Sequence, residues 1–131
     1  MPHFEPIDNE TEKIITAVID CAFKVYVTLG PGLLESVYEA CMSHELNKRR
    51  IAHERQFKVP IVYDGIPLSE GLRIDLLIDK KIVVELKAVE EMQPIFQSQL
   101  ITYLKLTKNR IGLLINFNVV NFRSAVKRII L

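Results

Sequence analysis

The sequence has little of what marks several common protein classes. Only two cysteines occur, Cys21 and Cys41, and both lie in apolar stretches with helical spacing. They exclude a disulfide scaffold and favour a reducing, cytoplasmic setting. No apolar run approaches the roughly 20 residues that a membrane-spanning helix needs, and the opening residues MPHFEPIDNETEK lack the apolar segment of a signal peptide. We therefore expect a cytoplasmic domain that has no membrane partner.

Excess charge of one sign is missing as well. The 131 residues carry 17 basic and 16 acidic side chains, a net charge of +1, so no strong overall field attracts a polyanion. The chain has no internal repeat, no low-complexity tract and no linker rich in glycine, serine or proline. His3, His44 and His53 have no metal-ligand spacing, so a zinc site is not expected. The sequence predicts one domain spanning residues 1–131.

What is present is a change of hydrophobic period along the chain. Apolar residues recur at helical spacing from Ile14 to Tyr26, and Asn9 is the expected N-cap of this helix, with Glu12 as its capping-box partner. After residue 53 the apolar residues alternate, which predicts strands, and Pro60 indicates an edge strand or a bulge.

The pattern predicts three helices and five strands along the chain. They are a helix from about Asn9 to the turn Gly30-Pro31-Gly32, a second helix ending in Lys48-Arg49-Arg50, strands at 57–63, 72–78 and 82–86 with a turn at Asp64-Gly65, a helix from Pro94 to about Thr107, and strands at 111–117 and 124–131. The last segment also suits a helix, but we expect a strand. The order α-α-β-β-β-α-β-β predicts an α/β fold in which helices flank a mixed β-sheet.

Three charged residues interrupt the apolar hairpin that is expected around Lys80. If the turn is centred on Lys80, Asp75 and Glu85 lie directly opposite each other, because each is five residues from the centre. Cross-strand neighbours have Cβ atoms about 4.5–5.5 Å apart, and like charges there are destabilising. Lys87 follows Glu85 by two residues and shares its face of the strand. A divalent cation between the carboxylates explains this arrangement; the alternative is a surface hairpin in which Lys87 forms a salt bridge with one acid.

Helical spacing brings further polar residues together. Gln99 and Tyr103 lie four residues apart and share one helix face. Tyr103 alone suits a core aromatic with a solvated hydroxyl, whereas a buried amide such as Gln99 needs hydrogen-bond partners. Glu35 and Tyr38 lie three apart on the second helix, where an acid in the first turn is also favoured by the helix dipole.

These motifs occur together in a known family. The stretch GPGLLESVYEA resembles the signature of small bacterial proteins called the GxxExxY family, and the similarity continues through EGLRIDLLIDKKIVVELKAVE, QSQLITYLKLT and IGLLINFN. The resemblance thus covers nearly the whole chain. That family looks like a compact branch of the PD-(D/E)XK nuclease superfamily, whose restriction-endonuclease-like core is a mixed sheet flanked by helices. One departure is Tyr26, where many relatives carry histidine.

The resemblance assigns roles to individual residues. It implies that Asp75 is the first acid of the superfamily motif, Glu85 the second and Lys87 its lysine. Glu35 matches the glutamate of the family signature and would be an additional helix-borne acid. The pattern Gln99-x-x-x-Tyr103 is similar to the Gln-x-x-x-Tyr motif of RecB-type members.

The implied activity is metal-dependent hydrolysis of phosphodiester bonds in nucleic acid, with DNA favoured. Asp75, Glu85 and Glu35 would supply oxygen ligands for Mg²⁺ or Mn²⁺. Lys87 would position the attacking water and stabilise charge on the phosphoryl oxygens, since neighbouring acids keep a lysine protonated. The Gln99–Tyr103 pair would orient the substrate backbone or a metal-bound water.

The partners are less well defined by the sequence. Basic residues form local clusters at 48–50, 80–81, 105–110 and 123–128, which suit either nucleic-acid contacts or ordinary solvated surface. With a net charge of +1, nucleic-acid binding should be modest and sensitive to salt. A domain this small has a limited footprint, so pairing into a homodimer is a second expectation. The alternative function is a non-catalytic nucleic-acid-binding or adaptor module that retains the nuclease fold.

Overall fold

The computed structural model of the chain describes residues 5–131, and His3 lies outside the described residues. The elements are α1 (Asn9–Leu29), α2 (Glu35–Lys48), β1 (His53–Tyr63), β2 (Ile66–Ile78), β3 (Ile82–Lys87), α3 (Pro94–Thr107), β4 (Ile111–Asn116), a short 3₁₀ turn (Phe122–Ser124) and β5 (Val126–Ile130). The predicted order α-α-β-β-β-α-β-β is confirmed, and the last segment is a strand.

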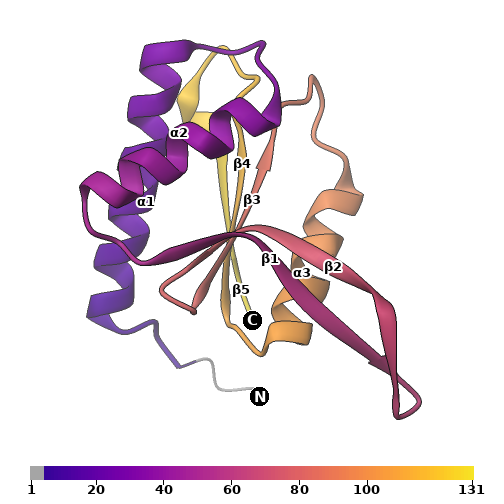
Figure 1. Cartoon of the computed structure of the whole chain (residues 1–131). Coiled ribbons are helices and arrows are strands. Elements are labelled where there is room, and N and C mark those ends of the chain that lie inside the picture. The colour runs from indigo at the N-terminus through magenta and orange to yellow at the C-terminus, as the bar shows by residue number, and fades with distance from the viewer. Residues whose placement is uncertain (1–4) are drawn as a thin grey trace.

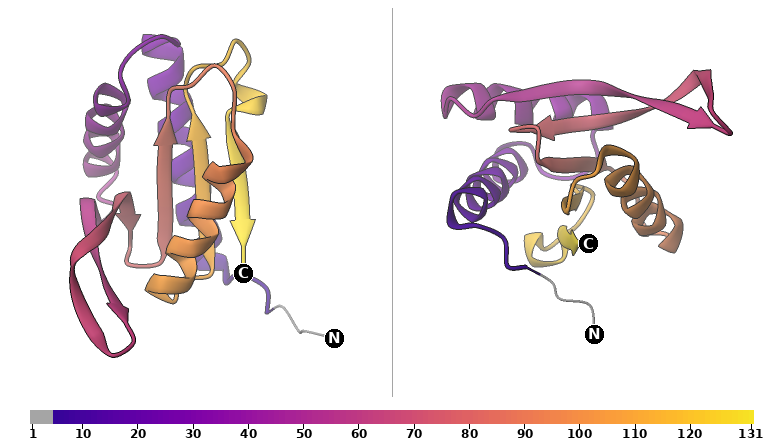
Figure 2. Two further views of the ribbon diagram at one scale, coloured as in Figure 1. Left: turned by 90° about the vertical axis from the view of Figure 1, so that its right-hand side faces the viewer. Right: turned by 90° about the horizontal axis from the view of Figure 1, so that it is seen from below.

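The five strands form one mixed sheet in the order β1-β2-β3-β4-β5. Neighbouring strands run antiparallel except β3 and β4, which are parallel and are joined by α3. Helices α1 and α2 cover one face of the sheet and α3 covers the other (Figures 1 and 2). Strands β3 and β4 are covered on both sides and are buried nearly throughout, as expected for parallel strands between helical layers.

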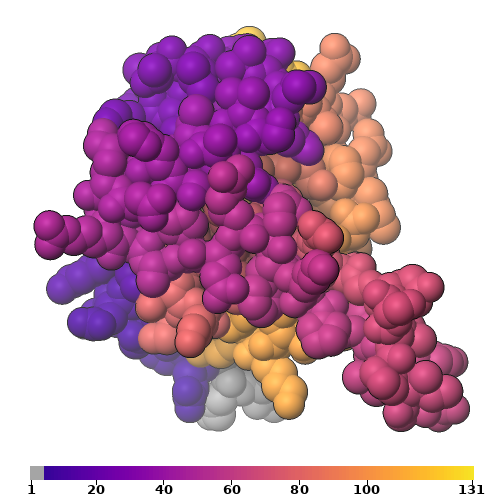
Figure 3. All heavy atoms as spheres, viewed as in Figure 1, coloured from indigo at the N-terminus to yellow at the C-terminus, as the bar shows by residue number. Residues whose placement is uncertain are grey.

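The hairpin of β1 and β2 extends well beyond the rest of the sheet. Only Leu76, Leu77 and Ile78 of β2 pair with β3, and the turn end of the hairpin, where residues 62–71 are all exposed, protrudes from the body as an arm (Figure 3). The predicted turn is confirmed, because Asp64 and Gly65 adopt φ angles of 52° and 74°, the left-handed pair that tight hairpins require. The register shifts between Pro60 and Val62, which confirms the predicted irregular edge strand.

The turn between α1 and α2 is held by one buried tyrosine. The Tyr38 hydroxyl donates to the Gly30 carbonyl at 2.7 Å and accepts from the Leu33 amide at 3.1 Å. Its ring is stacked on Phe117, with centroids 4.4 Å apart. Tyr38 therefore fixes where α2 begins.

One expectation about α1 is wrong. The N-cap is Asp8 rather than Asn9, and it makes no side-chain capping bond. Asp8 has extended backbone angles, whereas Asn9 is already the first helical residue, so the Asn9–Glu12 capping box cannot form.

Packing of α3 against the sheet depends on Gly112 in β4. A Cβ atom at this position would lie 2.9 Å from Leu100 Cδ1 and 3.0 Å from Cδ2 and Cγ, and Leu100 is completely buried. We expect Gly112→Ala to lower the free energy of unfolding by about 1–3 kcal/mol, measured by urea denaturation. In a Leu100→Ala background, Gly112→Ala should not lower the free energy of unfolding further. A decrease as large as that in the wild-type background would contradict this explanation.

Candidate active site

The β2–β3 hairpin brings two acidic side chains together. The pairs Leu76↔Val84 and Ile78↔Ile82 centre the turn on Lys80. Extending this register by one residue places Asp75 opposite Glu85, at the point where β2 turns away from β3. The negative charge of Asp75 contributes to the raised pKa of Glu85, as expected for two neighbouring carboxyl groups. The predicted juxtaposition of these two acids on one face is confirmed.

Asp75 is anchored to the backbone of the neighbouring strand. Its Oδ2 accepts a hydrogen bond from the Leu86 amide at 2.8 Å. The backbone donor that would otherwise continue the strand ladder is therefore used to orient a carboxylate.

Glu85 is an acid in an apolar environment. Its side chain is 7% exposed, and burial raises the pKa of Glu85 to about 9, with the negative charge of Asp75 adding to the shift and Lys87 opposing it. Within residues 5–131 its buried Oε1 has no hydrogen-bond partner. An unpaired buried carboxylate oxygen is costly and requires an explanation, and coordination of a cation is one.

Lys87 and Tyr103 border the acid pair. The Lys87 ammonium lies 4.4 Å from the centre of the Phe96 ring on α3, within the range of a cation–π contact. The pKa of Tyr103 is raised by burial and by the negative charges of Glu85 and Asp75. Its side chain packs against the core cluster that contains Val83 and Leu100, and within residues 5–131 no hydrogen bond joins it to either acid.

Gln99 is exposed and makes no side-chain hydrogen bond within the described part of the chain. It lies between Phe96 and Tyr103 on α3, three residues after one and four before the other, so it shares their helix face. Within residues 5–131 no hydrogen bond joins Gln99 to the acids, so its orientation toward them stays a prediction.

Glu35 is not brought to the acid pair. It is exposed in the first turn of α2, and among residues 5–131 no three His, Cys, Asp or Glu side chains gather closely enough to hold a metal ion. The buried acids of this helix are instead Glu39, one turn further on, and Glu45, of which Glu45 forms salt bridges with Lys24 and Lys48. The start of α2 is fixed by Tyr38, which leaves Glu35 at the solvent-facing end of the helix.

Two polar residues near the site, Glu39 and Gln56, were not predicted from the sequence. Glu39 accepts a hydrogen bond from Gln56, whose amide also donates to Asp75 Oδ1 at 3.2 Å. Gln56 has a positive φ of 48°, which no residue pattern in β1 indicates. Tyr26 does not join the cluster, because its hydroxyl donates to the Val119 carbonyl at 2.6 Å.

The donor set fits a hard divalent cation. Mg²⁺ is usually bound by one or two carboxylates and retains several waters, and Asp75 with Glu85 offers two carboxylates with one orphaned oxygen. Zinc sites are usually built with thiolate and imidazole ligands, whereas Asp75 and Glu85 offer carboxylate oxygens.

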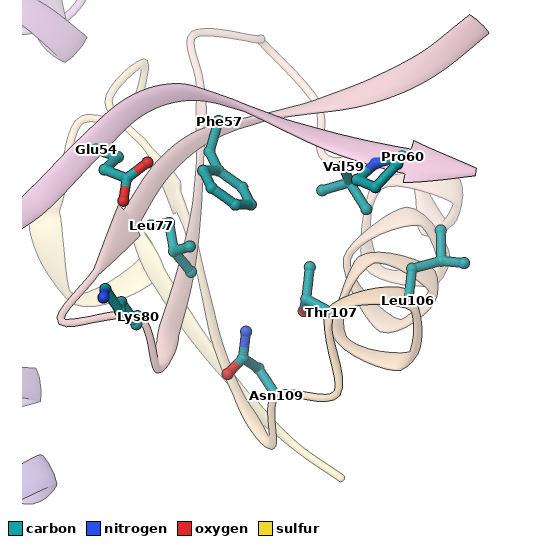
Figure 4. Close-up of a pocket in the computed structure, with 9 residues that line it drawn as sticks. All are labelled: Glu54, Phe57, Val59, Pro60, Leu77, Lys80, Leu106, Thr107 and Asn109. Carbon is teal, nitrogen blue, oxygen red and sulfur yellow. The ribbon is translucent and has the colours of Figure 1, made fainter. Parts of the chain in front are cut away.

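A separate hollow lies between β1, the β2–β3 turn and the end of α3 (Figure 4). This pocket has a volume of about 370 Å³ and is lined by apolar side chains including Phe57, Val59 and Leu77. None of the predicted site residues lines it.

Comparison with known proteins gives one match. A family model described as the PD-(D/E)XK nuclease superfamily matches residues 12–129. No curated protein and no solved structure matches the chain. No helix within residues 5–131 has the length and apolar character needed to cross a membrane. The match covers nearly the whole chain, including the hairpin with its two acids and lysine, and the mixed sheet agrees with it. The chain therefore belongs to the PD-(D/E)XK nuclease superfamily.

Proposed function

We propose that this protein is a metal-dependent nuclease that hydrolyses phosphodiester bonds, with DNA as the favoured substrate. The observation that carries the proposal is the buried Glu85 beside Asp75, with one carboxylate oxygen unpaired and Lys87 close by. Superfamily membership indicates a nuclease-type function, and nucleases of this superfamily typically use divalent metals. The signature from Gly32 to Tyr38 supports a narrower assignment to the GxxExxY family.

Asp75 and Glu85 would hold the cation, with Mg²⁺ or Mn²⁺ as the expected ion. When bound, the ion would neutralise phosphate charge and lower the pKa of a coordinated water. Asp75 is already oriented by the Leu86 amide, and Glu85 presents its free Oε1. Glu35 remains a proposed additional ligand, which would have to reach the pair through a change at the start of α2.

Lys87 would position the attacking water and stabilise negative charge on the phosphoryl oxygens. Its ammonium lies over the Phe96 ring, within the range of a cation–π contact. A protonated amine donates hydrogen bonds but cannot accept a proton, so we assign it a positioning role. Tyr103 and Gln99 would orient the substrate backbone or a water from the α3 side.

The base of the arm supplies a surface for the nucleic acid backbone. Lys58 and Arg73 are directly paired across β1 and β2 and are both exposed. Within residues 5–131 neither has an acidic partner at ion-pair distance. Like charges placed opposite each other are destabilising, and a phosphate between them removes the repulsion. Arg73 lies two residues from Asp75, about 7 Å along an extended strand.

We expect Lys58→Ala with Arg73→Ala to weaken binding of a DNA duplex in EDTA. The slope of log K against log salt should become shallower by about 0.9 for each cation that contacts phosphate, measured by fluorescence anisotropy. Lys127→Ala on β5, at the opposite edge of the sheet, is the matched control. An unchanged slope in the double variant would exclude the base of the arm from the contact.

The direct test of activity is incubation with single- and double-stranded DNA and RNA. Cleavage in Mg²⁺ or Mn²⁺ that EDTA abolishes supports the proposal. A protein that binds nucleic acid but neither binds a divalent cation nor cleaves supports the alternative function, an adaptor module retaining the fold. Sedimentation of the purified chain tests the proposed homodimer, and the cytoplasmic location remains a proposal from the cysteine content.

A further inference from the structure

Helix α2 contains an acid that the proposed chemistry does not use. Glu39 is 7% exposed, and both of its carboxylate oxygens have partners on β1. Oε2 accepts from Arg55 Nε at 3.1 Å and pairs with the Arg55 guanidinium. Oε1 accepts from the Gln56 amide. A buried carboxylate with this many donors is held in one orientation.

The two partners of Glu39 are consecutive strand residues, which is unusual. In a regular strand the side chains of neighbours point to opposite faces of the sheet. Here Arg55 and Gln56 both contact the same carboxylate. The reason is the φ of 48° at Gln56, in the left-handed region that residues with side chains seldom adopt. The pairing of β1 with β2 continues in register on either side of this residue.

The distorted backbone at Gln56 has a consequence for Asp75. The Gln56 Nε2 that donates to Glu39 also donates to Asp75 Oδ1 at 3.2 Å. Asp75 Oδ2 is held by the Leu86 amide. Both oxygens of Asp75 are thus oriented, one by the backbone of β3 and the other by a side chain that Glu39 orients from α2.

We propose that Glu39 and Gln56 are positioning residues that set the orientation of Asp75 relative to Glu85. This inference rests on the proposed metal-dependent function, because its purpose is the geometry of the cation ligands. Glu39 acts only through Gln56, whose amide nitrogen faces two carboxylate oxygens at once. Groups that orient metal ligands typically change metal affinity or activity by about 10–100-fold when they are removed.

Glu39→Gln tests the transmission without touching Asp75. A glutamine at position 39 has only one oxygen that can accept a hydrogen bond from Gln56. If its NH₂ group faces Gln56 instead, the amide of Gln56 would have to rotate, and the oxygen of Gln56 would then face Asp75. We expect Mn²⁺ affinity, measured by titration without substrate, to fall by about 10-fold or more. The apparent metal requirement for cleavage should rise by the same factor, with little change in KM for DNA.

Gln56→Leu removes the link and completes a double-mutant cycle. In the Gln56→Leu background, Glu39→Gln should have no further effect on Mn²⁺ affinity, because no side chain then connects position 39 to Asp75. Glu54→Gln is the matched control, since Glu54 is exposed on the same strand and, within residues 5–131, forms no hydrogen bond or ion pair with Glu39 or Asp75. It should leave Mn²⁺ affinity unchanged.

The outcomes separate this inference from the proposed function. If the wild-type protein binds Mn²⁺, either of two results would overturn the positioning role alone. One is that the effects of the two substitutions on Mn²⁺ affinity are additive; the other is that Glu39→Gln leaves the affinity unchanged. Wild-type protein that binds no divalent cation would overturn both. Thermal unfolding of each variant in EDTA confirms that the affinities compare folded proteins.

Discussion

Lys87→Ala and Glu85→Gln should each reduce DNA cleavage by at least about 100-fold, through different steps. Glu85→Gln keeps the shape of the side chain but replaces a carboxylate with a neutral amide, a poorer ligand for a hard cation. It should weaken Mn²⁺ binding strongly. Lys87→Ala leaves both acids in place, so it should retain the metal and lose the turnover rate. Calorimetric titration with Mn²⁺ beside a plasmid-nicking assay distinguishes the two variants.

Matched controls for these substitutions lie in the same part of the chain. Lys81→Ala, in the exposed turn of the same hairpin, and Glu90→Gln, exposed just beyond β3, should cleave at the wild-type rate. If Lys87→Ala and Glu85→Gln lose metal binding equally, Lys87 stabilises the arrangement of the two acids and does not act in the reaction itself.

The hairpin site could be predicted from the sequence because a short turn fixes the register of its strands. With the turn centred on Lys80, the pairing of Asp75 with Glu85 follows from counting residues, and the observed pairs flanking the turn agree. The same holds for Tyr103 on α3, since helical spacing determines the face on which a residue lies. Local geometry was sufficient in both cases.

The helix-borne acid could not be predicted in this way. Glu35 and Glu39 lie one turn apart on α2, and spacing alone does not say which of them is buried. The choice depends on where α2 begins, which is set by the contacts of Tyr38 with Gly30 and Phe117. The link from Glu39 to Asp75 also needs the left-handed Gln56, a conformation imposed by tertiary contacts and not by residue type.

The stability of the metal-free protein should fall as pH rises from about 6 to about 8. The pKa of Glu85 is raised from 4.5 to about 9 in the folded chain, so between these values the folded state retains a proton that the unfolded state has released. Stability then decreases with pH, by at most about 1.4 kcal/mol per pH unit.

Glu85→Gln should abolish this pH dependence while it abolishes activity. The amide cannot ionise, and its NH₂ group can donate to Asp75 as the protonated carboxyl would. We therefore expect the variant to be more stable than the wild type at pH 8 in EDTA, by about 1–3 kcal/mol, measured by urea unfolding at several pH values. Saturating Mn²⁺ should raise wild-type stability at pH 8, because the cation takes the place of the proton, and should leave the variant nearly unchanged. A wild-type stability that is flat between pH 6 and 8, with the variant parallel to it, would mean that Glu85 is already ionised without a cation. The buried Oε1 of Glu85, which has no hydrogen-bond partner within residues 5–131, would then have to be stabilised by a group other than a cation.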